Sequence, residues 1–313
     1  MDVIAAMSET DIPVVQGPTR QAFIPLLEAH REEILSVKRK TFKYGAVDRQ
    51  QLDVYYPPVQ NRSASGKHPV LVFIYGGGFA SGERIFPPPL DLCYVNLGAF
   101  FAKRGIVTVI PDYRLVPEVK FPEPIEDIRD AITFIVKYSE QVETEDNIQA
   151  DFSNIFVMGH SAGSIYTATM LLYPNLLSRE IRTRIRSAIL TGGAYRFSPE
   201  IPAAAAVPFL QLYGSWEQLL EKMPATLLER ATSEALEPFP ELLVMASEKE
   251  PPMIAPANLE FIAALNSKIG QDVPFSIMKG HNHISPHWAL GSGQGEEWAE
   301  EVTQWIKTRS GSR

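Results

Sequence analysis

Short apolar runs alternate with amphipathic helical stretches along most of this chain. The run PVLVFIY (69–75) is continuously apolar, which is typical of a strand buried on both faces of a parallel sheet. Further runs of this kind predict strands at 105–111, 154–159, 187–193, 240–247 and 273–279, and a hairpin is predicted at 41–58. Because parallel strands need helical crossovers, the alternation predicts an α/β fold with a mostly parallel sheet and helices on both faces.

Two segments fall outside this alternation. Residues 1–19 hold few periodic apolar positions and predict a loose arm, which a helix from Thr19 to Ser36 follows. Between the strands at 187–193 and 240–247 lie about 45 residues, too many for a simple connection, and they predict two or three short helices. A lid or cap would occupy this position, and an extra surface helix pair is the alternative. The predicted parts are therefore an N-terminal arm and cap helix (1–38), a catalytic domain (39–194 and 240–313) and a cap insertion (195–239).

Composition excludes several classes of partner. The chain has 29 basic and 37 acidic residues, a net charge of −8 and no dense basic cluster, so a nucleic-acid partner is not expected. No apolar run approaches the ~20 residues that span a bilayer, and no secretory signal is evident at the N-terminus. The single cysteine, Cys93, lies in an apolar setting and is predicted to be a small buried residue rather than a nucleophile. We expect a cytoplasmic protein without a membrane partner.

The stretch NIFVMGHSAGS (154–164) indicates a nucleophilic serine. An apolar strand stops at Gly159, and Ser161 stands between small residues just before a helix-favouring segment. A sharp strand-to-helix turn of this kind exposes a serine and directs the N–H groups of the helix toward the reacting centre. The alternative is an ordinary strand-to-helix connection, so the pattern needs partners elsewhere in the chain.

An oxyanion hole is predicted directly after the strand at 69–75. There the glycines of Tyr75-Gly76-Gly77-Gly78-Phe79 allow backbone N–H groups to face a ligand with no Cβ in the way. We expect Gly77, Gly78 and Ala162 to donate these N–H groups. A flexible turn would explain the loop on its own.

The general base is expected in GHNHISPH (280–287), after the strand at 273–279. His287 falls inside the helix that Ser285 and Pro286 begin, so His283 is the preferred base and His281 the alternative. The spacing H-x-H-x₃-H also resembles a metal site, but no Cys, Asp or Glu ligand lies near it in the sequence. We therefore expect no metal.

The carboxylate that orients the base should lie between Ser161 and His283. The single aspartate in this interval, Asp272, precedes a strand and would lie at the wrong edge of the sheet. The predicted acid is therefore a glutamate in the loop SEKEPP (247–252). Glu250 lies further into this loop and is preferred, with Glu248 as the alternative.

Three blocks give the chain, from about residue 40 onward, a resemblance to a known family. YGGGF (75–79) is similar to the motif H-G-G-G, GHSAG (159–163) to G-x-S-A-G, and PDYRLVPEVKFPEPIEDI (111–128) to D-Y-R-L-x-P-E-x-x-F-P-x-x-x-x-D. These motifs characterise α/β-hydrolases of the hormone-sensitive-lipase-like branch, which includes carboxylesterases and kynurenine formamidases. The chain departs from the pattern at Tyr75, where histidine is usual, and at the predicted acid, where aspartate is usual.

The resemblance implies a fold and a set of roles. The α/β-hydrolase fold implies an eight-stranded, mostly parallel sheet with a helical cap, to which the N-terminal segment contributes. The matched motifs make Ser161 the nucleophile, point to His283 as the base and align Glu250 with the family's acid. Homodimers paired through an edge strand occur in this family, and the sequence does not decide whether this chain forms one.

The predicted function is hydrolysis of carboxylic esters of small to medium acyl or aromatic substrates through an acyl-enzyme, without a metal or organic cofactor. Enzyme alternatives are an arylformamidase acting on N-formylkynurenine, and a lactone hydrolase or transacylase. A non-catalytic binding protein with a hydrolase fold is the alternative outside enzymes. The side chains expected to contact substrate are Tyr75, Phe79, His160, Tyr195 and Trp216.

Overall fold

A single mixed sheet forms the centre of the computed structural model, which describes residues 1–58, 66–143, 148–197, 203–232 and 234–310. Within these residues the sheet has eight strands. The first three strands in the sheet pair antiparallel and the rest pair parallel, as the sequence predicts. The spatial order is β1 (Arg39–Lys43), β2 (Gln51–Tyr55), β4 (Val107–Pro111), β3 (Lys67–Ile74), β5 (Gln149–His160), β6 (Ile185–Thr191), β7 (Glu241–Lys249) and β8 (Phe275–Asn282).

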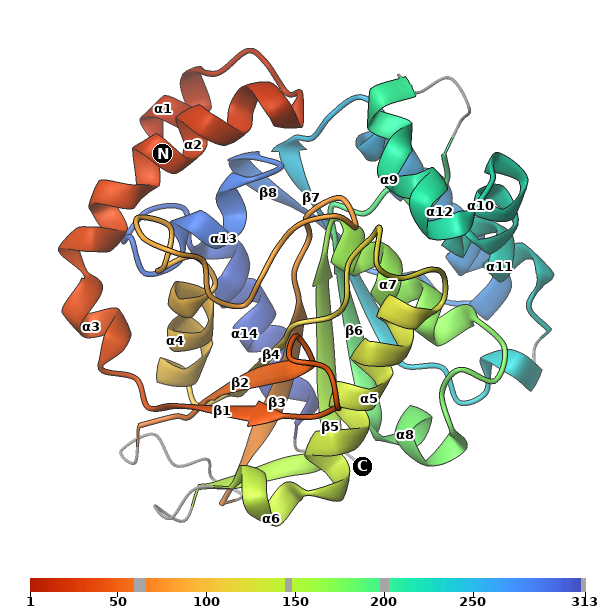
Figure 1. The fold of residues 1–313 in the computed structure, drawn as a ribbon, viewed down its shortest axis with the longest axis horizontal. Coiled ribbons are helices and arrows are strands. Elements are labelled where there is room, and N and C mark those ends of the chain that lie inside the picture. The colour runs from red at the N-terminus through yellow and green to blue at the C-terminus, as the bar shows by residue number, and fades with distance from the viewer. Residues whose placement is uncertain (59–65, 144–147, 198–202, 233, 311–313) are drawn as a thin grey trace.

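Helices cover both faces of this sheet, which confirms the predicted fold class (Figure 1). One face carries α4 (Val95–Lys103), α13 (Ser285–Ala289) and α14 (Glu297–Arg309). The other carries α5 (Glu123–Lys137), α7 (Ala162–Leu172) and α12 (Ile254–Ile269). Two short helices lie outside these layers: α6 (Ser139–Val142) and α8 (Arg179–Arg184).

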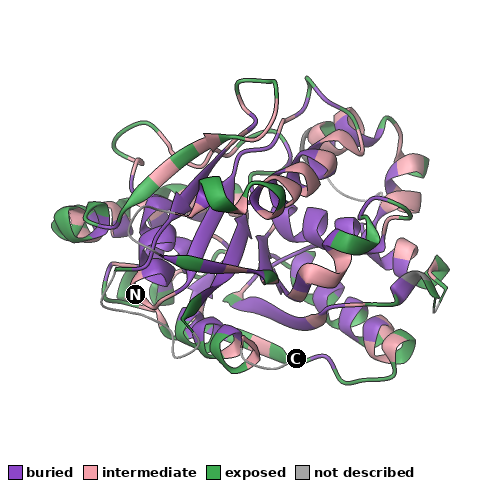
Figure 2. Ribbon diagram, turned by 90° about the horizontal axis from the view of Figure 1, so that it is seen from below, coloured by how far each residue is buried: buried purple, intermediate pink, exposed green. Residues whose placement is uncertain are grey.

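The strands at the centre of the sheet are buried along most of their length (Figure 2). In β3, every residue from Val70 to Ile74 is at most 2% exposed. This confirms the prediction that the continuous apolar run at 69–75 is a strand covered on both faces. Cys93 is also buried, as predicted.

The N-terminal segment is helical, so the prediction of a loose arm over residues 1–19 is wrong. It contains α1 (Asp2–Ala6), α2 (Ile12–Ala29) and α3 (Arg31–Leu35). Helix α2 continues through Pro18 although an internal proline disfavours a helix by about 3 kcal/mol. Burial of one face compensates, because side chains four residues apart are each at most 1% exposed: Val15, Thr19, Phe23 and Leu27.

The segment between β6 and β7 forms the predicted short helices in its described part. These are α9 (Ala203–Tyr213), α10 (Trp216–Lys222) and α11 (Pro224–Arg230), followed by a 3₁₀ turn at Glu234–Leu236. Residues 198–202 and 233 of the expected cap insertion lie outside the described residues. Helix α11 packs on α7 and α12, whereas α1 packs on β8 and α2 on α13. The two helical segments therefore flank the sheet from different sides (Figure 1).

None of the described helices is both long and apolar enough to cross a membrane.

The long motif at 111–128 has a structural role. The carboxylate of Asp127 is fully buried and accepts hydrogen bonds from Arg114 Nη2 at 2.8 Å, from the Arg114 backbone N–H at 2.9 Å and from Gln50 Nε2 at 2.8 Å. These bonds fix the chain after β4 to helix α5. A buried carboxylate with this many donors is stable only while its partners remain in place.

We therefore expect Asp127→Ala to lower the free energy of unfolding by about 3 kcal/mol, because it leaves Arg114 and Gln50 without their acceptor. Urea unfolding followed by circular dichroism measures this loss. Asp130→Ala on the same helix is the matched control: Asp130 pairs with Arg129 at 2.8 Å but is 47% exposed, so the loss should stay below about 1 kcal/mol. Equal losses in the two variants would contradict this role for Asp127.

Candidate active site

Ser161 lies on a strained turn between β5 and α7. Its φ is 54° and its ψ is −121°, a backbone conformation that is uncommon for a residue other than glycine. The turn also requires close backbone contacts on both sides of the serine. A Cβ at Gly163 would lie 2.1 Å from the carbonyl oxygen of Ile74, and one at Gly159 would lie 2.4 Å from that of Gly163. Gly163 is therefore needed for the turn to pack against β3, and Gly159 for β5 to pack against the start of α7.

The structure brings together the serine, the preferred histidine and the preferred acid. His283 Nε2 lies 2.9 Å from Ser161 Oγ, and His283 Nδ1 lies 2.6 Å from Glu250 Oε2. Because the carboxylate can only accept, Nδ1 carries the proton, and Nε2 of the neutral ring is free to accept from the serine hydroxyl. The side chains of His283 and Glu250 are each only 1% exposed. This chain of hydrogen bonds is the arrangement that nucleophilic catalysis requires.

The two alternative residues lie elsewhere. Glu248 is exposed, and its Oε2 accepts from the backbone N–H of Gly280 at 2.8 Å. His281 Nε2 donates to the carbonyl oxygen of Gly295 at 2.9 Å, while Nδ1 lies 2.9 Å from Ser285 Oγ. Neither side chain is directed at Ser161.

Two further backbone features hold the acid, and the sequence analysis did not identify them. The N–H of Ser247 donates to Glu250 Oε1 at 3.0 Å. Gly192, after β6, has a φ of +58°, and a Cβ there would lie 2.9 Å from Glu250 Oε1 and 3.3 Å from the His283 ring. The glycine pair that ends the run SAILTGG was the available signal, because glycine after a strand often marks a close approach.

The glycine loop lies against the serine from the other side. A Cβ at Gly76 would lie 2.9 Å from Ser161 Cβ, while Gly77 and Gly78 have positive φ values of 129° and 59°. Among the described residues, no acceptor pairs with the N–H groups of Gly77, Gly78 or Ala162. These three N–H groups therefore remain available to an incoming ligand.

Tyr75, Phe79 and Tyr195 were expected to contact substrate, but each is at most 1% exposed. The Tyr75 hydroxyl donates to Asp112 Oδ1 at 2.7 Å, and its ring stacks on Tyr113 with the centroids 4.8 Å apart. Tyr75 thus supports the glycine loop from beneath, which corrects its expected role. Because their side chains are covered, Phe79 and Tyr195 do not form an open binding surface here either.

His160 and Trp216 complete the expected set. His160 is buried, and its Nε2 donates to the carbonyl oxygen of His283 at 2.9 Å, so it contacts the base rather than open space. Trp216 is half-buried on α10 and packs against the core.

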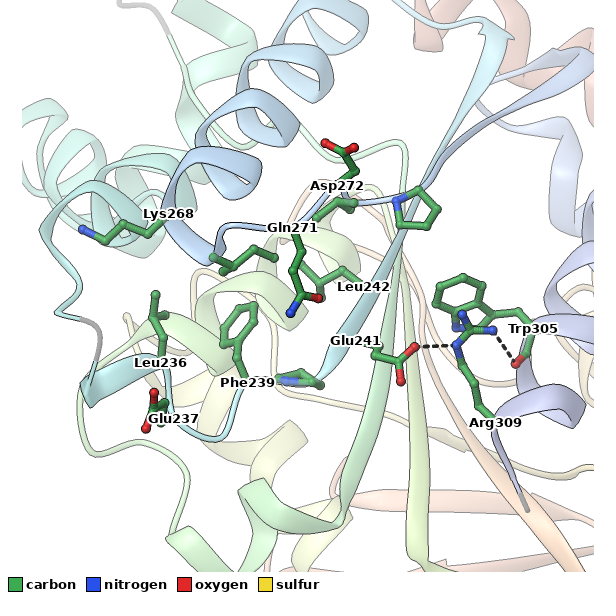
Figure 3. Close-up of a pocket in the computed structure, with 14 residues that line it drawn as sticks. Leu236, Glu237, Phe239, Glu241, Leu242, Lys268, Gln271, Asp272, Trp305 and Arg309 are labelled. Atoms are coloured by element: carbon green, nitrogen blue, oxygen red, sulfur yellow. Dashed lines mark hydrogen bonds and ion pairs between the residues drawn. The ribbon is translucent and has the colours of Figure 1, made fainter. Parts of the chain in front are cut away.

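The cavity in Figure 3 lies at the opposite edge of the sheet. Its volume is about 750 Å³, and Glu241 at the start of β7 and Asp272 just before β8 line it. Glu241 pairs there with Arg309, Nε to Oε2 at 2.7 Å. Asp272 therefore lies far from the carboxyl end of β5, as its exclusion from the candidate acids assumed.

The metal interpretation of the three histidines has no geometric support. In the described parts of the chain, no three His, Cys, Asp or Glu side chains gather in a way that could hold a metal ion. His283 already contacts Glu250 and Ser161, and His281 faces Gly295.

Known proteins resemble the chain at both the sequence and the fold level. The family described as BD-FAE matches residues 52–184. A kynurenine formamidase from Drosophila melanogaster is 22% identical over 265 residues, 84% of this chain and 81% of that protein. Probable carboxylesterase 13 of Arabidopsis thaliana is 32% identical over 141 residues, 44% of this chain and only 42% of that protein. Esterase B from Lactobacillus rhamnosis superposes with a TM-score of 0.68 at 15% identity, over 96% of this chain and 97% of that one. The chain has the α/β-hydrolase fold.

The predicted resemblance to the branch of carboxylesterases and kynurenine formamidases is thereby confirmed. Three further histidines of this chain lie in or beside the site. Burial lowers the pKa of His287 to about 3 and that of His281 to about 4. Burial also holds the pKa of His160 well below its ordinary value, and the nearby rings of His287 and His283 lower it further.

These depressed pKa values predict a loss of stability in acid. The unfolded chain binds a proton at each of these histidines near pH 6.5, whereas the folded chain does not accept that proton until the pH is much lower. The contribution of each histidine to the free energy of unfolding is therefore complete above about pH 6.5. It is lost as the pH falls below that value, by at most about 1.4 kcal/mol per pH unit for each histidine.

Urea unfolding at pH 7.5, 6.0 and 5.0 measures the slope. His287→Gln should reduce it by about one proton, since glutamine cannot titrate. The same slope in this variant as in the native protein would show that His287 does not contribute.

Proposed function

We propose that this α/β-hydrolase is a serine carboxylesterase that cleaves small to medium acyl or aromatic esters. The observation that carries the proposal is the continuous chain of hydrogen bonds from Glu250 through His283 to Ser161, with distances of 2.6 and 2.9 Å. The 2.9 Å between Ser161 and His283 falls within the range in which a nucleophile passes its proton to a base, and the 2.6 Å between His283 and Glu250 is that of a short hydrogen bond to a carboxylate. Relatives named carboxylesterase and structural neighbours that are esterases support the same reaction class.

In the proposed reaction, Ser161 Oγ attacks the carbonyl carbon of the ester while its proton passes to His283 Nε2. The N–H groups of Gly77, Gly78 and Ala162 then stabilise the negative charge that forms on the carbonyl oxygen. His283 returns the proton to the leaving alcohol, which leaves the acyl group on Ser161. Water, deprotonated by the same histidine, attacks this acyl-enzyme and releases the acid.

Glu250 has two functions in this proposal. Its Oε2 accepts from Nδ1–H, which fixes the tautomer that leaves Nε2 unprotonated, and its charge stabilises the imidazolium that forms during each proton transfer. A glutamate can do this in place of the usual aspartate because the N–H of Ser247 holds its second oxygen at 3.0 Å. That bond keeps a side chain with one extra methylene from turning away from the ring.

The proposed substrate class rests on an aromatic cluster between the glycine loop and the segment after β6. Phe79 lies edge-on to Tyr166 of α7 and to Phe209 of α9, with ring centroids 5.1 and 5.0 Å apart, and Tyr213 packs 6.5 Å away. Phe79, Tyr166 and Tyr213 are covered, so in this proposal the half-buried Phe209 is the ring of the cluster that meets an apolar acyl or aromatic group. We propose that residues 195–239 and the N-terminal residues 1–38 act as the cap over that group.

Hydrolysis of a formamide is the second candidate, because the relative that aligns over most of the chain is named kynurenine formamidase. The same serine and base would attack a formyl carbon, so the site itself does not distinguish the two reactions. The relative rates with an ester and with a formamide substrate distinguish them.

We expect the purified protein to hydrolyse p-nitrophenyl acetate and butyrate faster than N-formylkynurenine and to react with a fluorophosphonate probe at Ser161. Ser161→Ala should abolish turnover of every substrate and labelling by the probe while the circular dichroism spectrum stays native, because the nucleophilic oxygen is lost. Turnover that survives in this variant would refute the assignment, and faster cleavage of N-formylkynurenine would favour the formamidase.

Glu250→Gln should lower kcat for p-nitrophenyl butyrate on the order of 10³-fold, because a neutral amide no longer stabilises the imidazolium. Glu248→Gln is the matched control, two residues away in the same loop. Its side chain contacts Gly280 and not His283, so kcat should stay at the native value. If the two variants lose activity in the reverse order, Glu248 is the acid.

A further inference from the structure

The residues immediately before the acid and the base meet each other and the N-terminal segment. Lys249 is the last residue of β7 and precedes Glu250, and Asn282 is the last residue of β8 and precedes His283. The two lie opposite each other in the β7–β8 pair, past an irregularity in its register. Each side chain then reaches away from the sheet to the first 19 residues of the chain.

Lys249 binds the carboxyl end of α1. Its Nζ donates to the carbonyl oxygen of Ile4 at 3.1 Å, to that of Met7 at 2.8 Å and also to that of Ala5. Carbonyls at the end of a helix are a favourable site for a cation, and that of Ile4 also accepts from the backbone N–H of Met7 at 3.2 Å. The bonds therefore use all three protons of the ammonium group.

These bonds also keep the lysine charge away from the acid. Lysine and glutamate neighbours in a chain can pair, and an ammonium on Glu250 would compete with His283 for the carboxylate. In the structure the ammonium faces α1, while Glu250 contacts His283 and the N–H of Ser247. Helix α1 therefore holds both the backbone and the charge next to the acid.

Asn282 makes the corresponding connection for the base. Its Nδ2 donates to Thr19 Oγ1 of α2 at 2.9 Å, and both side chains are fully buried. Its Oδ1 accepts from the backbone N–H groups of Ile284 and Ser285 at 3.0 and 2.9 Å. The amide thus spans His283 in the sequence and ties the loop that carries it to α2.

We infer that Lys249 and Asn282 are positioning residues, through which α1 and α2 fix the acid and the base at the distances that the reaction needs. The inference rests on the proposed function, because it assigns these residues a role in the reaction at Ser161. In addition to its proposed role as a cap, the N-terminal segment would then directly influence the rate of the chemical step. Loss of either connection should therefore lower kcat more than it raises KM.

The experiment compares matched variants with p-nitrophenyl butyrate, well below their unfolding temperatures. Lys249→Met removes the three hydrogen bonds and should lower kcat about tenfold with little change in KM, while Lys249→Arg, which keeps the donors, should restore most of it. Thr19→Val removes the oxygen that accepts from Asn282 Nδ2 without a change of shape, leaving the weaker contact of Nδ2 with Met7 Sδ at 3.6 Å. It should also lower kcat, while Thr19→Ser should not. The control is Lys268→Met, because Lys268 Nζ also donates to a backbone carbonyl, that of Glu229 at 3.2 Å, but lies away from the site.

Hydrogen exchange gives a readout that does not depend on catalysis. In Lys249→Met and Thr19→Val, amides in 245–252 and 280–287 should exchange faster than in the native protein, while Lys268→Met should leave them unchanged. Native kcat and native exchange in Lys249→Met would overturn the inference, as would an equal loss of kcat in Lys268→Met. If the native protein hydrolyses no ester, the proposed function fails instead, and unchanged exchange in both loops would still refute the connection.

Discussion

The site depends first on the close approach of β5, α7 and β3 around Ser161. A Cβ at Gly163 would lie 2.1 Å from a carbonyl oxygen of β3, so this packing tolerates no side chain there. The same packing holds Ser161 at a φ of 54° and exposes its hydroxyl at the carboxyl edge of the sheet. The glycine loop, the base and the acid can act together only because Ser161 Oγ is held at a fixed position beside them. Such a turn costs on the order of 1–3 kcal/mol of backbone strain, and the packing of the surrounding core compensates for this cost.

A second constraint is the burial of a carboxylate. Glu250 and His283 are almost completely enclosed, which would be unfavourable for an isolated charge. Their hydrogen bond and the N–H of Ser247 compensate for the lost water. Enclosure also strengthens the interaction between the pair, since fewer water molecules screen it. The site is thus built from groups that hold one another in place, and the helices at the N-terminus extend that set through Lys249 and Asn282.

Sequence reasoning was least successful where tertiary packing overrides local preference. The scarcity of periodic apolar positions in residues 1–19 predicted a loose arm, yet α2 begins at Ile12 because Val15, Thr19, Phe23 and Leu27 are buried. The same limit applies to the side chains expected to contact substrate. An aromatic residue beside a glycine loop can point into a pocket or support the loop from beneath, and the sequence does not distinguish these. In the structure Tyr75 lies beneath the loop, and its hydroxyl donates to Asp112.

By itself, the sequence determined the α/β fold, the strand-to-helix turn at Ser161, the glycine loop and the short set of residues from which an acid and a base could come. It did so because hydrophobic periodicity and glycine positions are local properties. Only the tertiary structure shows that Glu250 rather than Glu248 contacts His283 and that His283 rather than His281 contacts Ser161, since neighbours two residues apart near a strand end can point to different partners. The connection of α1 and α2 to both loops was likewise beyond the sequence, because it joins residues more than 240 positions apart through side chains with no pattern of their own.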